Sequence, residues 1–202
     1  MLNEQGFNLW ADGYDRSVGL SDEGNTYPFA GYKRVLNAIY NEVLANGCQT
    51  VLDIGFGTGT LTQKLYEHGC TVYGQDFSQR MIELAKVKMP KAELYQGDFT
   101  KGLVEKLKQN RYDAIVATYS LHHLTDAEKV VFIENLRPLN DGGKIYIGDV
   151  MFGNRVQLEA CKADAGDEWD GDEIYFVVDE LQARFPQMRF EPLSYCSGVL
   201  TL

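Results

Sequence analysis

Long apolar runs and an excess of basic residues are both missing from the 202-residue sequence. No stretch approaches the roughly 20 apolar residues that a membrane-spanning helix needs. Lysine and arginine number 19 against 29 aspartates and glutamates. The resulting net charge of -10 would repel phosphate backbones and anionic lipid. We therefore expect no nucleic acid and no membrane among the partners of this protein.

Cysteine is also scarce, and its spacing excludes two further classes of protein. Cys48, Cys70, Cys161 and Cys196 form no close pair and no metal-type motif, so we expect neither a disulfide framework nor a metal site. The amino terminus has no basic segment followed by an apolar core, which a secretory signal would require. These absences favour a cytoplasmic protein with reduced thiols.

Strand-like and helix-like patterns alternate along most of the chain. Apolar residues at helical spacing predict a first helix over residues 35–44. Strands are then predicted at 50–54, 71–75, 92–96, 112–120 and 142–150, and helices at 61–68, 78–89, 101–108 and 126–137. This order predicts an α/β fold with a mainly parallel, doubly wound sheet covered on both faces.

The carboxyl-terminal part of the chain departs from this alternation. Residues 151–185 mix strand and helix signals, and we interpret them as helical. Residues 188–202 predict two strands joined near Ser197-Gly198, which form a hairpin at one sheet edge. No repeat or linker interrupts the chain, so we expect one domain over 1–202, with subdivisions at 1–47, 48–150 and 151–202.

The run "DIGFGTG" places Gly55, Gly57 and Gly59 directly after the first predicted strand. In doubly wound sheets, glycine at this place lets the backbone approach a ligand closely. A tight turn that needs positive φ and binds nothing is the alternative. The dinucleotide fingerprint needs a glycine where Thr60 stands, and the Gly-Lys-Ser/Thr ending of a P-loop is absent. The pattern therefore favours a nucleoside ligand without a pyrophosphate.

Two acids follow the next strands at the positions that a nucleoside would occupy. Asp76 ends the second predicted strand, where its carboxylate can accept hydrogen bonds from both ribose hydroxyls. Its alternative role is to cap the next helix, for which Ser78 competes. After the third strand, Asp98 can accept an adenine amino proton, with Phe99 and Phe77 against the two faces of the ring.

Taken together, these motifs resemble the class I S-adenosylmethionine-dependent methyltransferases, of the small bacterial type related to quinone-biosynthesis methyltransferases. The resemblance covers residues 51–150: "VLDIGFGTG", "GQD", "GDF", "YDAIVATYSLHHL" and "LRPLNDGGKIYIGDV" arrive in the family's order. It implies a Rossmann-like seven-stranded sheet with order 3-2-1-4-5-7-6, strand 7 antiparallel, and an amino-terminal helical lid. It also implies that the glycine loop receives the methionine portion of S-adenosyl-L-methionine.

The resemblance further implies that methyl transfer occurs next to the fourth strand. "TYSLHHL" places Tyr119 beside the cofactor and His122 and His123 as candidate catalytic residues. Alternatively, the two histidines simply hydrogen-bond to backbone. Family members of this kind usually need no metal. Alignment of the reacting atoms by itself supplies about 7–11 kcal/mol, and a base is needed only for a protonated acceptor.

Aromatic residues near the amino terminus are the remaining candidates. In similar methyltransferases this segment folds over the cofactor, which implies that Tyr14 contacts its methionine end and that Tyr32 lines the substrate pocket. Packing of the lid is the alternative. Residues 151–185 would cover the acceptor. Their acidic run "DAGDEWDGDE" favours either a cationic acceptor or a solvated face.

The sequence thus predicts an enzyme that transfers a methyl group from S-adenosyl-L-methionine to a small molecule. The alternative is a methyltransferase-like module that binds the cofactor or a partner without turnover. The acceptor and the oligomeric state are not determined by these motifs.

Overall fold

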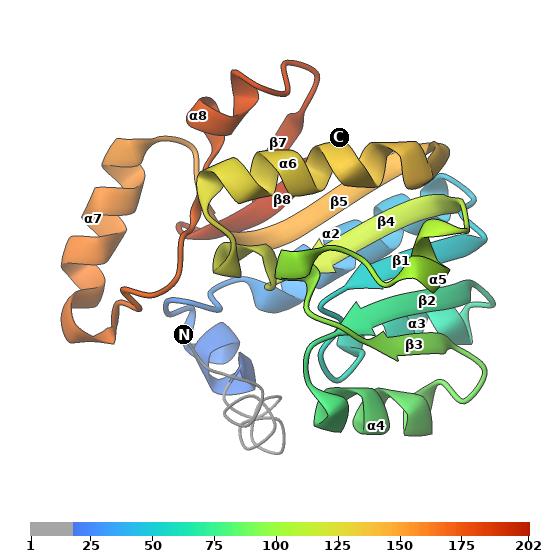
Figure 1. Ribbon diagram of the computed structural model, residues 1–202. Coiled ribbons are helices and arrows are strands. Elements are labelled where there is room, and N and C mark those ends of the chain that lie inside the picture. The colour runs from blue at the N-terminus through green and yellow to red at the C-terminus, as the bar shows by residue number, and fades with distance from the viewer. Residues whose placement is uncertain (1–17) are drawn as a thin grey trace.

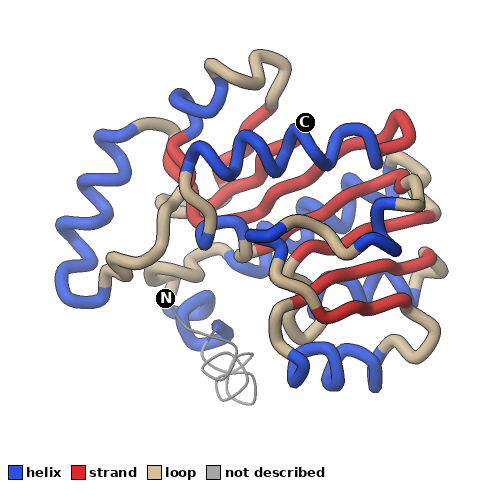
Figure 2. The backbone as a smooth tube through the Cα atoms, in the orientation of Figure 1, coloured by secondary structure: helices blue, strands red, loops and turns tan. Residues whose placement is uncertain are grey.

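A mixed β-sheet flanked by helices forms the protein in a computed structural model, which describes residues 18–202 (Figures 1 and 2). The strands are β1 (Thr50–Ile54), β2 (Thr71–Asp76), β3 (Glu93–Gln96), β4 (Tyr112–Thr118), β5 (Asn140–Phe152), β6 (Phe176–Val177), β7 (Arg189–Pro192) and β8 (Ser197–Thr201). The α-helices are α2 (Tyr32–Ala45), α3 (Thr60–Glu67), α4 (Gln79–Lys88), α5 (Glu105–Lys108), α6 (Asp126–Leu136), α7 (Arg155–Ala165) and α8 (Val178–Gln182). Residues 18–24 are also helical.

The strand order is β3-β2-β1-β4-β5-β8-β7. Strands β1 to β5 are parallel, and β8 pairs antiparallel with both β5 and β7. The predicted order 3-2-1-4-5-7-6 is confirmed. Strand β8 is the predicted seventh strand, and β7 is the predicted sixth strand. The numbers differ because the short β6, which pairs with the end of β5, interrupts a segment that the sequence predicts as helical.

Alternation along β1 explains why both faces of the sheet carry helices. Val51 joins a buried cluster with α2 and α3, whereas Leu52 and Ile54 join a second cluster with α6 on the opposite face. Burial on both sides is typical of a parallel sheet. Figure 1 shows α2 and α3 behind the sheet and α6 in front of it. The predicted doubly wound arrangement is therefore confirmed.

Local signals determine where the helices begin. The Ser78 hydroxyl accepts a hydrogen bond from the Met81 N–H, so Ser78 caps α4 as predicted. Thr125 and Glu128 form a capping box at the start of α6. The predicted helix over 101–108 is wrong in its first half. A 3-10 turn, η1 (Phe99–Lys101), ends at Gly102, and only residues 105–108 form an α-helix.

The hairpin is confirmed, but its predicted turn is misplaced. Ser197 and Gly198 are the first residues of β8, and residues 193–196 make the turn. The Ser197 hydroxyl donates a hydrogen bond to the Ala30 carbonyl at 2.6 Å, which fixes the start of β8 against the segment before α2. A Ser-Gly pair signals a turn only when no such tertiary contact holds it in a strand.

Beyond β5 the chain leaves the sheet, and α7 stands apart from it in Figure 1. Residues 166–175 return from α7 toward the carboxyl end of β4, through a 3-10 turn, η4 (Gly166–Glu168). No helix within residues 18–202 has the length and apolar character needed to cross a membrane. All four cysteines are buried free thiols, as predicted.

Candidate active site

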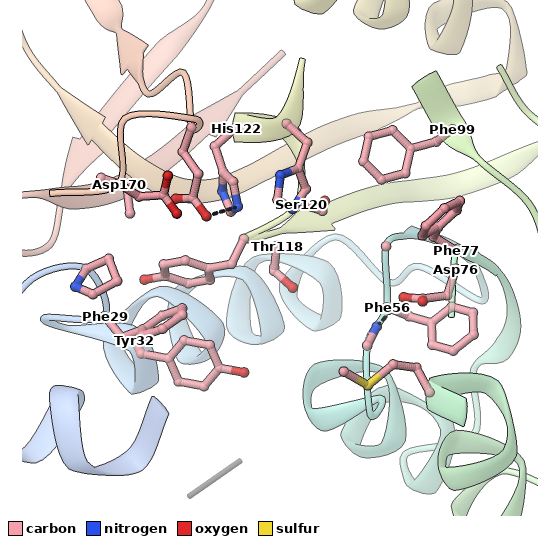
Figure 3. A pocket seen from close by; sticks show the side chains of 18 of the residues that line it. Phe29, Tyr32, Phe56, Asp76, Phe77, Phe99, Thr118, Ser120, His122 and Asp170 are labelled. Carbon is pink, nitrogen blue, oxygen red and sulfur yellow. Dashed lines mark hydrogen bonds and ion pairs between the residues drawn. The ribbon is translucent and has the colours of Figure 1, made fainter. Parts of the chain in front are cut away.

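A cavity of about 430 Å³ lies at the carboxyl ends of the parallel strands (Figure 3). This is where open α/β sheets bind ligands, because the connections on either side diverge there. The walls come from the segment before α2, the loops after β1 to β4, and the stretch between α7 and β6. Sequence-predicted residues in its lining are Tyr32, Gly55, Gly57, Asp76, Phe77, Asp98, Phe99, Tyr119, His122 and His123.

The glycine loop after β1 forms the floor of the cavity. Gly55 has φ 70°, and a Cβ there would lie only 2.5 Å from the Ser120 Cβ. Ser120 is held in place because its hydroxyl donates to the Ile54 carbonyl at 2.9 Å. Gly57 has φ 56°, and nothing lies within 4 Å of the place where its Cβ would be. Gly55 thus permits close packing of two loops, and Gly57 leaves open space.

The Asp76 carboxylate lies at the end of β2 and is 8% exposed. Its Oδ2 accepts a hydrogen bond from the Gly57 N–H at 2.8 Å, and its Oδ1 accepts one from the Ser78 N–H at 2.8 Å. Burial raises the pKa of Asp76 to about 6, although these backbone hydrogen bonds oppose the shift. The carboxylate is therefore mostly ionised at pH 7 and fixes the shape of the glycine loop.

Aromatic side chains surround Asp76. Figure 3 shows Phe56, Phe77 and Phe99 at this end of the cavity. Asp98 lies in the same wall, where its carboxylate accepts hydrogen bonds from the Thr100 N–H and hydroxyl and pairs with Lys101 at 3.0 Å. Burial by itself would raise the pKa of Asp98, but these contacts outweigh it and lower the pKa. One end of the cavity thus combines flat apolar surfaces with two carboxylates.

The opposite end is built around His122 in η2 (Leu121–His123). The His122 Nδ1 lies 2.7 Å from the Asp149 Oδ1, and its Nε2 lies 3.4 Å from the Glu173 Oε1. Asp149 is fully buried on β5, and its Oδ2 has no hydrogen-bond partner among the described residues. A single imidazole therefore lies between two carboxylates.

The stretch that carries Glu173 is tied directly to η2 and α6. The Ile174 N–H donates to the His122 carbonyl at 2.8 Å, and Lys129 Nζ donates to the Ile174 carbonyl at 2.6 Å. The Tyr175 hydroxyl donates to the Glu173 Oε2 at 2.6 Å. These bonds hold Glu173 beside His122 although the two residues are far apart in sequence.

The two adjacent histidines have opposite acid–base behaviour. Burial by itself lowers the pKa of His122, but the charge and hydrogen bond of Asp149 and the charge of Glu173 outweigh it and raise the pKa. Burial and the neighbouring charge of His122 lower the pKa of His123 to about 4. At pH 7 His123 is therefore a neutral imidazole, whereas His122 is biased toward the charged form.

A third wall consists of aromatic rings from the segment before α2, from the first residue of α2 and from the loop after β4. The Tyr119 ring centroid lies 5.4 Å from that of Phe29 and 5.0 Å from that of Tyr32. Tyr27 stacks on Trp169 at 5.1 Å, and its hydroxyl contacts the Tyr175 hydroxyl. Figure 3 shows Phe29 and Tyr32 across the cavity from Asp76. These rings enclose the space between the two polar ends.

Among the described residues, one predicted site residue does not line this cavity. Gly59 caps α3, where a Cβ would approach the Met89 Cε to 2.8 Å, so close packing on α4 explains this glycine. Tyr14 lies outside the described residues, and its predicted contact with the cofactor stays a prediction.

Several residues of the site are missing from the sequence prediction. The most consequential are Glu173, which lines the cavity, and Asp149, which lies buried behind His122, because they hold His122 from two sides. A lone acid in the apolar strand "KIYIGDVMF" is a signal for Asp149. The acidic run has no such signal, because a solvated face fits its pattern equally well. In the structure, four of its residues line the cavity: Glu168, Asp170, Asp172 and Glu173.

Comparison with known sequences identifies relatives over most of the chain. Residues 51–143 match the family model described as a methyltransferase domain. An uncharacterized methyltransferase of Geobacillus thermodenitrificans is 38% identical over 194 residues, which cover 91% of this chain and 86% of the relative. One from Anoxybacillus flavithermus is 42% identical over 160 residues, which cover 79% and 72% of the two chains.

Solved structures share the fold at low sequence identity. Magnesium protoporphyrin IX methyltransferase of Synechocystis PCC 6803, with bound SAH, has a TM-score of 0.70 at 19% identity and covers 98% of this chain and 96% of that one. A DhpI-SAM-HEP complex has a TM-score of 0.68 at 20% identity, with 96% and 92% coverage. Both structures contain the cofactor or its demethylated product.

Proposed function

The chain belongs to the class I S-adenosylmethionine-dependent methyltransferases, and from this premise we propose that it methylates a small-molecule acceptor held beside His122, His123 and Glu173. The observation that carries the proposal is the single cavity that joins the glycine loop and Asp76 to this cluster. A cofactor at one end and an acceptor at the other would thus share one water-poor space.

The residues present fit S-adenosylmethionine at the Asp76 end of the cavity. Gly57 leaves open space where any other residue would place a Cβ, and Asp76 offers an ionised carboxylate for the ribose hydroxyls. Phe77, Phe99 and Asp98 are proposed to hold the adenine. When bound, the cofactor supplies an electrophilic methyl group on a positively charged sulfur.

Tyr119 and the glycine loop, through Gly55, are proposed to hold the methionine portion. The described lining of the cavity contains six acidic side chains, of Asp76, Asp98, Glu168, Asp170, Asp172 and Glu173, and no lysine or arginine. Negative charge and aromatic faces favour a cation such as the sulfonium. The same lining offers nothing to neutralise a phosphate, which supports a small acceptor without phosphates over a nucleic acid.

The acceptor's reacting atom is proposed to lie between His123 and Tyr32. His123 is neutral at pH 7, so a ring nitrogen of its imidazole can accept a hydrogen bond from the acceptor's nucleophilic group. His122 is held between two carboxylates and is a positioning residue in this proposal. The aromatic wall of Phe29, Tyr32 and Tyr119 excludes water and restricts the acceptor's orientation.

Two measurements test the proposal. The first is calorimetric titration with S-adenosylmethionine and S-adenosylhomocysteine, and we expect both to bind below millimolar concentration. A folded protein that binds neither would refute the assignment of the cavity. The second is transfer of a labelled methyl group to compounds of a small-molecule metabolite extract. Cofactor binding with no methylated product would instead favour the non-catalytic module.

A further inference from the structure

His122, His123 and Glu173 each bring one ligand-type atom to the same point of the cavity wall. These atoms all lie within 4.8 Å of one another. Within residues 18–202, they form the one group of three or more His, Cys, Asp or Glu side chains close enough to hold one metal ion. The two imidazole rings are adjacent in sequence, yet their centroids are only 4.3 Å apart, so they converge on one side of η2.

One measured distance matches metal coordination directly. Zinc binds imidazole nitrogen at about 2.0–2.1 Å and carboxylate oxygen at about 2.0–2.2 Å, so two ligand atoms of a tetrahedral site lie about 3.3–3.5 Å apart. The His122 Nε2 and Glu173 Oε1 are 3.4 Å apart.

Groups behind the cluster orient its ligands in the way that metal sites require. Metal-binding histidines usually donate their second ring N–H to a carboxylate, and ligating carboxylates are hydrogen-bonded in turn. Asp149 fills the first role at 2.7 Å from the His122 Nδ1. The Tyr175 hydroxyl fills the second role by donating to the Glu173 Oε2 at 2.6 Å. Asp149 and Tyr175 therefore orient two of the three ligands, His122 and Glu173, before any ion arrives.

We propose that His122, His123 and Glu173 bind one divalent transition-metal ion, with a further coordination position open to the cavity. Two imidazoles and one carboxylate suit Zn²⁺ or Fe²⁺, and Mg²⁺ prefers an all-oxygen set. The ion would orient the acceptor by binding an oxygen, nitrogen or sulfur atom of the acceptor. It would thereby take the place of the hydrogen bond between the acceptor and His123. This use of the ion rests on the proposed function, but the metal site does not.

The test uses Co²⁺ as a spectroscopic probe on the full chain without an affinity tag. We expect one Co²⁺ per chain, visible absorption bands typical of nitrogen and oxygen ligands, and displacement by Zn²⁺. His123→Gln and Glu173→Gln should each weaken Co²⁺ binding at least tenfold, because even outer groups of metal sites contribute 10–100-fold. Circular dichroism of each variant checks that the fold is intact.

Matched controls separate the cluster from its surroundings. Glu168→Gln changes a second glutamate of the same cavity, and His68→Gln changes the remaining histidine, which lies exposed at the end of α3. Neither should alter Co²⁺ binding by more than about twofold. Equal affinity in all variants, strong thiolate-to-cobalt absorption, or no binding by the wild type would each overturn the metal site. S-adenosylhomocysteine binding by the same preparation tests the proposed function separately.

Discussion

Replacement of Asp76 by asparagine is the perturbation that tests the cofactor end of the cavity most directly. Asp76 accepts hydrogen bonds from backbone N–H groups, among them those of Gly57 and Ser78, each at 2.8 Å and each on its own oxygen. In Asp76→Asn one carboxylate oxygen is replaced by an NH₂ group, which points its own N–H toward a backbone N–H, so that no hydrogen bond can form. One buried N–H therefore loses its partner, at a cost of about 1–3 kcal/mol.

That cost falls on the conformation of the glycine loop, which we propose binds the cofactor. If the whole amount is lost from binding, the affinity for S-adenosylhomocysteine drops about 5-fold to 150-fold. The matched control is Asp113→Asn, because the Asp113 carboxylate also accepts hydrogen bonds from two backbone N–H groups, those of Gln49 and Thr50, each at 2.8 Å. Asp113 is not among the residues that line the cavity, so the affinity of Asp113→Asn should change less than about fivefold.

The assay is isothermal titration with S-adenosylhomocysteine at pH 7.5 and pH 5. The pKa of Asp76 is about 6, so at pH 5 the wild-type carboxyl is mostly protonated and accepts hydrogen bonds poorly. Wild-type affinity should therefore fall on acidification, whereas that of Asp76→Asn should change much less. A folded variant that binds within threefold of wild type, or a wild type indifferent to this pH change, would show that Asp76 does not hold the ribose.

Three further predictions concern stability. Gly55→Ala and Gly57→Ala both place alanine at positive φ, at a cost of about 1–2 kcal/mol each, but only Gly55→Ala meets the Ser120 Cβ at 2.5 Å. Urea denaturation should find Gly55→Ala about 1–3 kcal/mol less stable than Gly57→Ala, and equal stabilities would contradict the close approach of the two loops. Burial raises the pKa of Asp53 to about 7 from an ordinary value of 3.8, so its protonated form stabilises the fold at low pH and this stability is lost as pH rises toward 7. As pH rises from about 4 to about 7, the wild type should lose stability relative to Asp53→Asn by up to about 1.4 kcal/mol per pH unit, and above pH 7 the difference should level off. A difference that stays constant with pH would mean that the pKa of Asp53 is not shifted. Thr125→Ala removes the capping box of α6 and should cost about 1 kcal/mol in the same assay, whereas an unchanged midpoint would show that the cap contributes nothing.

The sequence was sufficient for the parallel part of the sheet because local patterns and topology agree there. Strands β1, β2 and β4 are short, mainly apolar runs, each followed by a helical pattern, and Ser78 and Thr125 mark the starts of the helices after β2 and β4. Right-handed crossovers leave few ways to arrange such units. For the same reason the glycine loop and Asp76 were found from sequence: the carboxyl ends of parallel strands meet at one edge whatever the details of packing.

The acceptor side was not predictable in the same way, because its groups come from segments with no fixed sequence separation. His122 looked like one of two equivalent histidines until Asp149 and Glu173 were seen at its two ring nitrogens. The acidic run gave no sign that Glu173 points into the cavity, because the Ile174 N–H bond to His122 is a tertiary contact. Short-range propensity carries no information about such a contact.

What the sequence by itself determined is thus the α/β sheet, the family and the position of the glycine loop and Asp76 at one edge of the sheet, since all three follow from spacing along single βα units. Tertiary structure alone decided that the pKa values of His122 and His123 shift in opposite directions and that Glu173 joins them. Burial and the distances between distant segments set the pKa values and ligand geometry, and both exist only after the chain has folded.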